Sequence, residues 1–384
     1  MPTKTRQSSE DSLQRYRPGG EVYRNGPSLA PLASINYGLG GVAYAIYRLA
    51  RSRRDAGLLD LAHDWIGRAL ALSPREDAFY NPAIEIDFAT VGDGSLFHST
   101  SGLHVVHALI CAARGRPGDA SAAERAIASF VEESRKPSKF PDLTLGTASL
   151  LLGCAELMES AMPGTRDGES VRVRGDEIAA DLLGILRSDR VAGSTRLRFL
   201  GIAHGWGGLL FALLRWTRAL EQPVDPAIVA RLDELADLGV PHDGGTCWPI
   251  QNDNRQVMPG WCNGTAGHAI LFALACEMLG TPRYRELAVE AARSAWVIRT
   301  AVGSLCCGEA GNAYAYLAVH RLTGDGLWLR RARTAARRAT QAPTEIHPPD
   351  ALYKGAVGVT VLANDLEHPT TASMPLFEPT RWRA

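Results

Sequence analysis

The chain alternates two kinds of predicted helix. One kind follows a short glycine turn and is apolar on nearly all sides, as in GLGGVAYAIYRLA from Gly38 and GTAGHAILFALA from Gly264. The other kind, as in LLDLAHDWIGRALAL from Leu58, carries apolar positions at three- and four-residue spacing with charged residues between them. That second pattern is typical of an amphipathic helix with one solvated face, whereas a helix that is apolar all round is buried on most sides. The alternation therefore predicts an inner layer of helices wrapped by an outer layer.

The glycine turn recurs along the whole chain. The seven turns that lead into an apolar helix have their glycine, or the equivalent serine, at Gly38, Ser99, Gly146, Gly205, Gly264, Gly308 and Gly355. Their spacing of 44 to 61 residues leaves room for two helices and their connections in each repeat. We therefore predict an all-α fold of seven helical-hairpin repeats, arranged as a closed double-layered ring or as an open solenoid. At the turns, glycine is expected to supply positive φ angles and close backbone approach.

Other elements are minor. Short extended pieces are predicted around residues 83–88 and 246–250. Residues 1–34 precede the first turn and are expected to be partly disordered or part of the outer layer. Residues 35–384 are expected to form a single domain, because the repeats occupy nearly all of this length.

Composition narrows the class of protein. The 384 residues include 41 basic and 41 acidic side chains, so the formal net charge is zero, which argues against nucleic acid or an anionic membrane as the main partner. No apolar run reaches the roughly 20 residues that span a bilayer. The polar start of the chain lacks the apolar segment of a secretory signal. We therefore expect a cytoplasmic protein.

The cysteines and histidines are mostly expected to be structural. Seven cysteines, an odd number spread over a large chain, do not indicate a disulfide framework. Three lie in apolar helical runs, where they are expected to pack as small hydrophobic residues: Cys111, Cys154 and Cys276. Four histidines lie within inner helices and are expected to be core or lumen-facing polar residues: His104, His107, His268 and His320. His98, before the second turn, is a further candidate for the site.

Three consecutive turns carry unusual residues beside the glycine. His204 precedes Gly205, Cys262 lies two residues before Gly264, and the pair Cys306-Cys307 precedes Gly308. Three thiolates leave a tetrahedral zinc ion one ligand short, and an open position is what a catalytic site needs; soft thiolates also favour zinc over magnesium or calcium. Taken singly, each cysteine is explained by packing at a helix end. His204 is explained equally by contacts to helix-end backbone groups, or as a fourth ligand that closes the site.

At these residues the chain resembles the lanthionine synthetase C-like cyclases of lanthipeptide biosynthesis. The resemblance runs from about Ile35 to Glu378. The matching motifs occur in order on the repeat: HGWGG at His204–Gly208, WCNGTAG at Trp261–Gly267, LCCGEAG at Leu305–Gly311, ALYKGAVG at Ala351–Gly358 and MPLFE at Met374–Glu378.

The resemblance implies an α/α toroid with a zinc ion at one end of its central cavity. It implies Cys262, Cys306 and Cys307 as the zinc ligands and His204 as the acid/base residue. Asp142, four residues before Gly146, matches an aspartate of the family ahead of the third turn, although a solvated loop carboxylate explains it equally well.

Some residues depart from the commoner pattern of the family. Where that pattern has Cys-His-Gly, this chain resembles a Cys-Cys-Gly branch, and the third thiolate adds one negative charge to the site. We therefore hypothesise a more reactive and more permissive cyclase. Asn263 occupies a position often held by tyrosine, and Arg255 is only a distant candidate for an arginine that often precedes the tryptophan.

The implied activity is addition of a peptide cysteine thiol to a dehydroalanine or dehydrobutyrine, which forms a lanthionine or methyllanthionine ring. The implied substrate is a dehydrated precursor peptide. A separate dehydratase or kinase-lyase is expected as a partner, since the repeats leave no room for one in this chain. The alternative is a non-catalytic, zinc-containing protein that binds peptides or thiols. Protein prenyltransferases also combine a helical toroid with zinc, but their mixed carboxylate, cysteine and histidine ligands do not match three cysteines.

Overall fold

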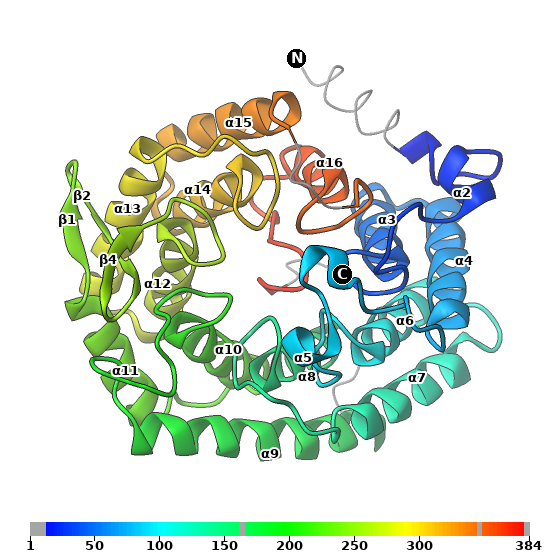
Figure 1. Ribbon diagram of the computed structural model, residues 1–384, viewed down its shortest axis with the longest axis horizontal. Coiled ribbons are helices and arrows are strands. Elements are labelled where there is room, and N and C mark those ends of the chain that lie inside the picture. Colours follow the sequence, from blue (N-terminus) through cyan, green and yellow to red (C-terminus); the bar gives the residue numbers. More distant parts are fainter. Residues whose placement is uncertain (1–12, 161–165, 344–347, 380–384) are drawn as a thin grey trace.

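The helices form two concentric rings (Figure 1). The computed structural model describes residues 13–160, 166–343 and 348–379. The inner ring consists of α3 (Leu39–Arg53), α6 (Thr100–Arg114), α8 (Thr147–Ser160), α10 (Trp206–Ala219), α12 (Thr265–Leu279), α14 (Glu309–Thr323) and α16 (Ala356–Asp365). The outer ring consists of α4 (Ala56–Leu72), α7 (Asp119–Glu133), α9 (Arg166–Ser188), α11 (Pro226–Asp237), α13 (Pro282–Val297) and α15 (Gly326–Gln341).

The inner ring is closed. Each inner helix packs against the next one along the chain, and α16 packs against α3, so the last inner helix meets the first. This contact excludes the open solenoid and confirms the all-α toroid of seven repeats. An antiparallel partner lies outside each inner helix from α3 to α14. No described helix is both long and apolar enough to cross a membrane.

Burial follows the two helix patterns read from the sequence. In α10, all residues from Trp206 to Trp216 are buried. In α15, by contrast, Trp328, Ala332 and Ala336 are buried while the arginines between them are not. The inner helices are enclosed by neighbours on both sides, by the outer ring and by the lumen contents, which explains why they are apolar all round.

The chain before the first turn lies on the outer ring. Tyr16 and Tyr23 place their rings edge-on to Trp65 of α4, with centroids 6.2 and 5.6 Å away, and the short helix α2 (Glu21–Asn25) belongs to this segment. Residues 1–12 lie outside the described residues.

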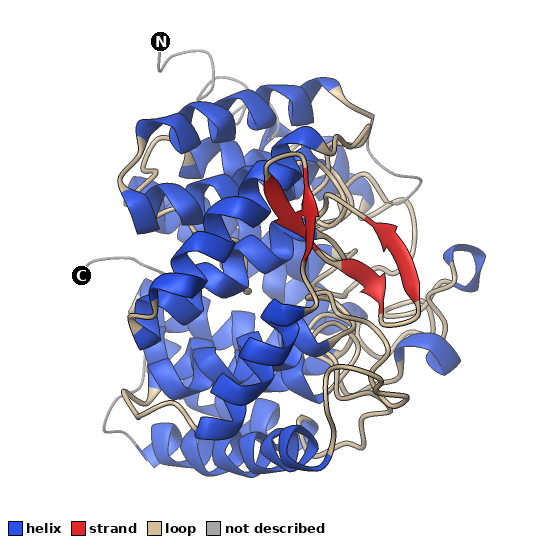
Figure 2. Cartoon of the chain, turned by 90° about the vertical axis from the view of Figure 1, so that its left-hand side faces the viewer, coloured by secondary structure: helices blue, strands red, loops and turns tan. Residues whose placement is uncertain are grey.

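The few strands lie with most loops at one end of the ring (Figure 2). Two hairpins form there, β1 (Val240–His242) with β2 (Gly245–Cys247) and β3 (Pro249–Gln251) with β4 (Asn254–Val257). They confirm the extended piece predicted at 246–250. The piece predicted at 83–88 instead forms a 3-10 turn, η1 (Pro82–Ile84), closed by a single bridge between Asn81 and Ile86, and then α5 (Phe88–Val91).

The turn glycines serve close approach of the backbone. Gly264, which caps α12, has an extended φ of −126°, so the prediction that these glycines supply positive φ was wrong at this turn. A Cβ on Gly264 would lie 2.4 Å from the carbonyl oxygen of Met258, and one on Gly267 would lie 2.3 Å from that of Trp261. Both distances are too short for any side chain, so the turn folds back on its own helix only with glycine there.

The lumen of the ring is filled by the C-terminal segment, residues 372–379, which Figure 1 shows at the centre. Three inner-helix arginines donate hydrogen bonds to its backbone carbonyls: Arg48 to Ser373 (2.9 Å), Arg321 to Ala372 (2.5 Å) and Arg215 to Phe377. Each arginine also pairs with a buried or half-buried carboxylate: Arg48 with Asp365 (2.8 Å), Arg215 with Glu156 and Glu159 (3.3 and 2.8 Å), and Arg321 with Glu378.

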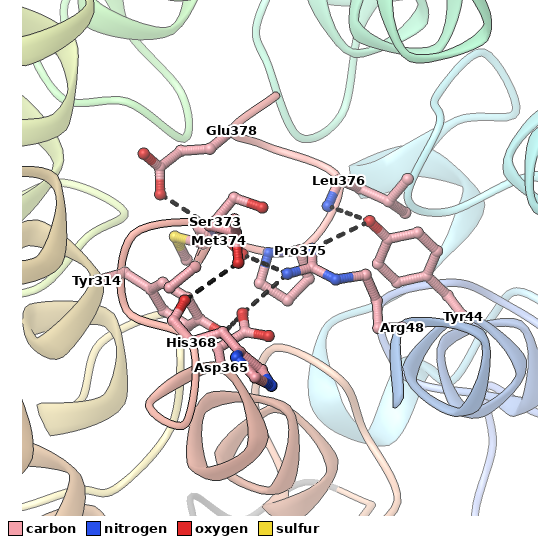
Figure 3. A network of polar contacts seen from close by, with 12 residues as sticks. Tyr44, Arg48, Tyr314, Asp365, His368, Ser373, Met374, Pro375, Leu376 and Glu378 are labelled. Carbon is pink, nitrogen blue, oxygen red and sulfur yellow. Dashed lines mark hydrogen bonds and ion pairs between the residues drawn. The ribbon is translucent and has the colours of Figure 1, made fainter. Parts of the chain in front are cut away.

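Figure 3 shows the part of this network around Arg48. The Tyr314 hydroxyl also donates to Asp365 (2.9 Å), and the Tyr44 hydroxyl accepts a hydrogen bond from the Leu376 backbone N–H (3.1 Å). Charged groups buried this deeply are tolerated only when paired, so the C-terminal segment and the inner helices stabilise one another.

Candidate metal centre

Hydrogen bonds join the seven turns into a closed belt, which we call the turn belt; each link runs between backbone groups except one, which uses the Ser95 hydroxyl. Most of these bonds use the residue two positions before the cap of each inner helix. The links are Asn36 N to Phe97 O (3.0 Å), Ser95 Oγ to Thr144 O (2.6 Å), Thr144 N to Ala203 O (3.1 Å), Ala203 N to Cys262 O (2.7 Å), Cys262 N to Cys306 O (3.1 Å), Cys306 N to Tyr353 O (2.9 Å) and Leu352 N to Asn36 O (2.9 Å).

The belt brings equivalent positions of different turns side by side. The residue directly before each cap is His204 in the fourth turn, Asn263 in the fifth, Cys307 in the sixth and Lys354 in the seventh. Because every turn is bonded to the next, these four positions follow one another along one end of the ring.

Three cysteines of the fifth and sixth turns form a compact cluster. Cys262 Sγ lies 3.4 Å from Cys307 Sγ, and Cys307 Sγ lies 3.5 Å from Cys306 Sγ. All three are free thiols, since a disulfide would need about 2.05 Å. In a tetrahedral zinc site with Zn–S bonds of about 2.3 Å, the sulfurs are about 3.8 Å apart. The donor set and the spacing therefore fit one zinc ion.

The electrostatics of the cluster are suited to a cation. The pKa of Cys262 is raised to about 12, because its contact with Cys307 and its burial outweigh an opposing contact with Cys306. Hydrogen bonding of the Cys306 thiol with Cys262 and Cys307, together with burial, raises the pKa of Cys306 well above its usual range. Three thiolates this close cannot all be ionised without a positive charge between them.

One positive charge is already present beside the cluster. Lys354 Nζ lies 3.4 Å from Cys307 Sγ. The motif that contains Lys354 is visible in the sequence, but its place in the site is not. The signal that points to it is its position directly before the cap glycine, the same position as Cys307 and His204 in their turns.

His204 forms a separate pair with Asp142. His204 Nδ1 lies 3.0 Å from Asp142 Oδ2 and 3.0 Å from Thr144 Oγ1. The other carboxylate oxygen of Asp142 accepts the backbone N–H groups of Thr144 and Leu145, at 3.0 and 2.6 Å. A carboxylate only accepts hydrogen bonds, so Nδ1 carries the proton and Nε2 is left to exchange one. Asp142 is buried, which answers the alternative of a solvated loop carboxylate.

His204 is not part of the thiol cluster. The described ligand atoms that lie within 4.8 Å of one another at this end of the ring are the sulfurs of Cys262, Cys306 and Cys307. His204 belongs to the neighbouring turn, which is bonded to the fifth turn through Ala203. The arrangement favours an open fourth position over a site closed by His204.

His98 is a buried neighbour of this pair. Burial, together with the charge of His204, lowers the pKa of His98 to about 3. Its Nε2 lies 3.3 Å from Asn36 Nδ2 and therefore accepts the amide hydrogen. His98 is thus a neutral, fixed part of the belt rather than a group that exchanges protons near neutral pH.

The two remaining sequence candidates occupy different places. Asn263 sits in the belt between His204 and the cysteines of the sixth turn, and its Oδ1 is buried without a hydrogen bond from the described residues. Arg255 is exposed on the hairpin strand β4.

The C-terminal segment supports the cluster from the lumen side. The Phe377 ring stacks on Phe211 with centroids 3.7 Å apart and meets Trp261 edge-on at 5.1 Å. Trp261 directly precedes Cys262 and also packs against Tyr353, whose hydroxyl donates to the Pro375 carbonyl at 2.5 Å. The aromatic cluster thereby fixes the fifth turn against the seventh.

Comparisons with known proteins agree with this arrangement. A family model described as lanthionine synthetase C-like protein matches residues 33–378. The solved structure of nisin cyclase is similar over 94% of both chains, with a TM-score of 0.69 and 12% identity, which shows the same fold.

Two curated relatives match over a part of the chain. LanC-like protein GCL1 of Arabidopsis thaliana is 32% identical in an alignment of 193 residues that covers 47% of this chain and 43% of that protein. A Danio rerio protein named glutathione S-transferase LANCL1 is 28% identical over 199 residues, 47% of this chain and 46% of that protein. The matched regions thus span less than half the length of these relatives. Since the family model covers most of the sequence and the fold agrees, the chain belongs to the lanthionine synthetase C-like family.

Proposed function

We propose that this protein is a zinc-dependent cyclase that adds a peptide cysteine thiol to dehydroalanine or dehydrobutyrine. The observation that carries the proposal is the juxtaposition on the turn belt of three clustered free thiols and a His204–Asp142 pair. Cys262, Cys306 and Cys307 would hold the ion and leave one position for the substrate. A bound zinc ion supplies acidity, because a thiol that coordinates it loses its proton.

The remaining steps are proton transfers and positioning by the chain. The reaction forms a bond between the substrate sulfur and the β-carbon of the dehydro residue, and the electron pair of the double bond moves toward the α-carbon as an enolate. The α-carbon then takes up a proton, so the addition involves no net oxidation or reduction. His204 Nε2 would take up the proton that the substrate thiol loses and donate it to the α-carbon, while Asp142 keeps the other ring proton on Nδ1 and fixes the ring.

Lys354 gives the three-cysteine site its charge balance. The Cys-Cys-Gly arrangement adds a negative charge relative to a site with one histidine, and the ammonium beside Cys307 offsets part of it. We therefore propose a smaller gain in reactivity from the third thiolate. With the Lys354 ammonium included, the site that holds the nucleophile is less negative than three thiolates alone would make it.

The proposed partners follow from the chemistry. The substrate would be a peptide that already contains dehydro residues, and we propose that a separate dehydratase supplies them. We also propose that residues 35–384 act as one domain in this reaction.

A second candidate function is suggested by a relative. The name glutathione S-transferase LANCL1 describes transfer of glutathione by that protein. In this chain the same site would then bind a small thiol, either to transfer it or only to bind it.

One experiment separates these functions. The protein is incubated with a dehydrated peptide that contains cysteine, with and without glutathione, and the products are analysed by mass spectrometry and thiol alkylation. Loss of the free peptide thiol without a change in mass supports the cyclase. A glutathione adduct of the peptide supports thiol transfer. If the protein holds zinc but the peptide is unchanged, a non-catalytic protein that only binds the thiol is supported. A wild-type protein whose Cys262, Cys306 and Cys307 hold no zinc would overturn the central assignment.

A further inference from the structure

A second group of metal-ligand side chains lies between the two rings. His63 comes from the outer helix α4, and His107 and Cys111 come from the inner helix α6. Their potential ligand atoms all lie within 4.8 Å of one another. His107 and Cys111 are four residues apart and so face the same side of α6, the side that packs against α4.

This group is separate from the thiol cluster of the turn belt. The helix α6 (Thr100–Arg114) begins at the turn belt, and Cys111 lies in its last turn, at the far end. At 1.5 Å per residue, Cys111 is roughly 17 Å along the helix axis from the belt. The two groups therefore cannot share an ion.

The three side chains are suited to a transition metal. Burial, with the nearby His63 and His104, lowers the pKa of His107 to about 4, and burial also lowers the pKa of His63. Both imidazoles are therefore neutral near pH 7, the form that binds metals. Burial raises the pKa of the Cys111 thiol to about 11, so this thiol ionises only if a cation is next to it.

Charged side chains of both signs surround the group. Asp60 precedes His63 by one helical turn, and its Oδ1 is buried and accepts no hydrogen bond from the described residues. Arg114 is the opposing charge, but both its Nε and Nη2 are engaged by Asp119, at 2.8 and 2.5 Å. The carboxylate of Asp60 is itself ion-paired, with Arg116 through Oδ2 and with Arg114, whose Nη1 lies 4.0 Å from Oδ1.

We propose that His63, His107 and Cys111 bind a zinc-class divalent ion that joins the inner helix α6 to the outer helix α4. Two imidazoles and one thiolate are donors that zinc accepts, and a water molecule would complete a tetrahedral site. The competing explanation is packing alone, since the rings of His63 and His107 are in tilted contact with centroids 5.8 Å apart. Packing alone predicts no bound metal.

The test uses the full chain with the belt site removed. In a Cys262→Ser/Cys306→Ser/Cys307→Ser variant, Co²⁺ alone is added as a spectroscopic probe and Zn²⁺ as a competitor. We expect one bound equivalent, with tetrahedral d–d bands and a sulfur-to-cobalt charge-transfer band that Zn²⁺ abolishes. Adding Cys111→Ala should remove the charge-transfer band, and adding His107→Gln should weaken cobalt binding at least tenfold.

The matched control is His104→Gln, which changes another partly buried histidine on α6 outside the group, and it should leave the spectrum unchanged. If the triple variant does not fold, the metal content of the otherwise wild-type chain decides: zinc should fall from two equivalents to one in His63→Gln and stay at two in His104→Gln. A folded protein with no cobalt bound, or a charge-transfer band that survives Cys111→Ala, would overturn the proposal.

Discussion

Lys354 Nζ lies 3.4 Å from Cys307 Sγ, so the seventh turn of the ring places a cation against a sulfur of the sixth. Cys307 is the residue that distinguishes the Cys-Cys-Gly arrangement, and the Lys354 ammonium offsets part of the negative charge that its thiolate adds. A charged group next to a metal ligand tunes the affinity of the site, and its loss typically costs 10- to 100-fold.

The first prediction concerns this lysine. Lys354→Met should lower zinc affinity by roughly tenfold, because the thiols lose the ammonium that favours their ionised, metal-binding form. Lys354→Arg keeps the charge and should retain most of the affinity. Competition with a chromophoric chelator measures the affinity. Equal zinc affinity in the methionine and arginine variants would show that the contact is only steric.

The second prediction concerns the third thiol. Cys307→His should still bind zinc but cyclise peptides several-fold more slowly, since the site loses a thiolate while Lys354 stays in place. Rates on two or more dehydrated peptides, normalised to the zinc content of each preparation, measure the effect. A zinc-loaded variant that is faster on every peptide would contradict the role assigned to Cys307.

The third prediction separates proton transfer from metal binding. His204→Asn should reduce the cyclisation rate by about 10²- to 10⁴-fold, the range for loss of a general acid or base. Asp142→Asn should have a smaller effect, because it disturbs only the tautomer and orientation of the ring. Both variants should keep their zinc, since neither side chain belongs to the thiol cluster. Loss of zinc from His204→Asn would instead indicate that the histidine is a ligand.

The fourth prediction tests the buried ion pair in the lumen. Arg48→Met should lower the free energy of unfolding by about 3–5 kcal/mol, because it leaves Asp365 buried without its cation. Burial already raises the pKa of Asp365 against the opposing effect of Arg48. A raised carboxyl pKa means that the folded state holds the proton more tightly, so stability from this group rises as pH falls through that pKa. The destabilisation by Arg48→Met should accordingly shrink at low pH.

Urea unfolding at several pH values measures this effect. The double variant Arg48→Met/Asp365→Asn serves as the control, because removing both charges should cost less than the sum of the two single changes. A single-variant cost below about 1 kcal/mol would show that the ion pair contributes little.

The fifth prediction is a pH dependence of stability from His98. Its pKa falls from about 6.5 in the unfolded chain to about 3 in the fold. Between those values the unfolded chain binds a proton that the folded chain does not, so the stability supplied by neutral His98 is complete above pH 6.5 and is lost as pH falls toward 3. The slope from this group is at most about 1.4 kcal/mol per pH unit.

Comparison of variants isolates that slope. His98→Gln, which keeps an acceptor for Asn36, should flatten the acid side of the stability curve, whereas His368→Gln, at an exposed site, should not change it. An unchanged acid slope in His98→Gln would mean that His98 is protonated in the folded protein.

The ring and the grouping of the cysteines could be predicted from the sequence because both depend on a repeated register. Glycine turns at regular intervals predict equivalent helix starts, and residues next to those starts must meet once the helices pack side by side. Lys354 follows the same rule. It directly precedes the cap glycine of its turn, as Cys307 does, and this shared position would have placed it in the site.

Other features do not follow from periodicity. Arg48 and Arg215 sit in otherwise apolar inner helices, and nothing in their spacing indicates that a distant C-terminal segment accepts their hydrogen bonds. Closure of the ring likewise depends on contacts between its first and last repeats. The extended φ of Gly264 was missed because the glycine is required by a close contact with Met258, which only the folded turn creates.

The bond from Leu352 N to Asn36 O has a consequence for how the protein is made. An open solenoid can fold repeat by repeat as it leaves the ribosome, because each repeat needs only its neighbour. Here the first turn is completed by the seventh, and Arg48 can donate its hydrogen bond to the carbonyl of Ser373 only when that residue has been synthesised. The apolar faces of the early repeats therefore stay uncovered until the last repeat has been synthesised. Contacts between residues this far apart in the sequence also slow folding. During synthesis these nascent hairpins are the stage most exposed to aggregation.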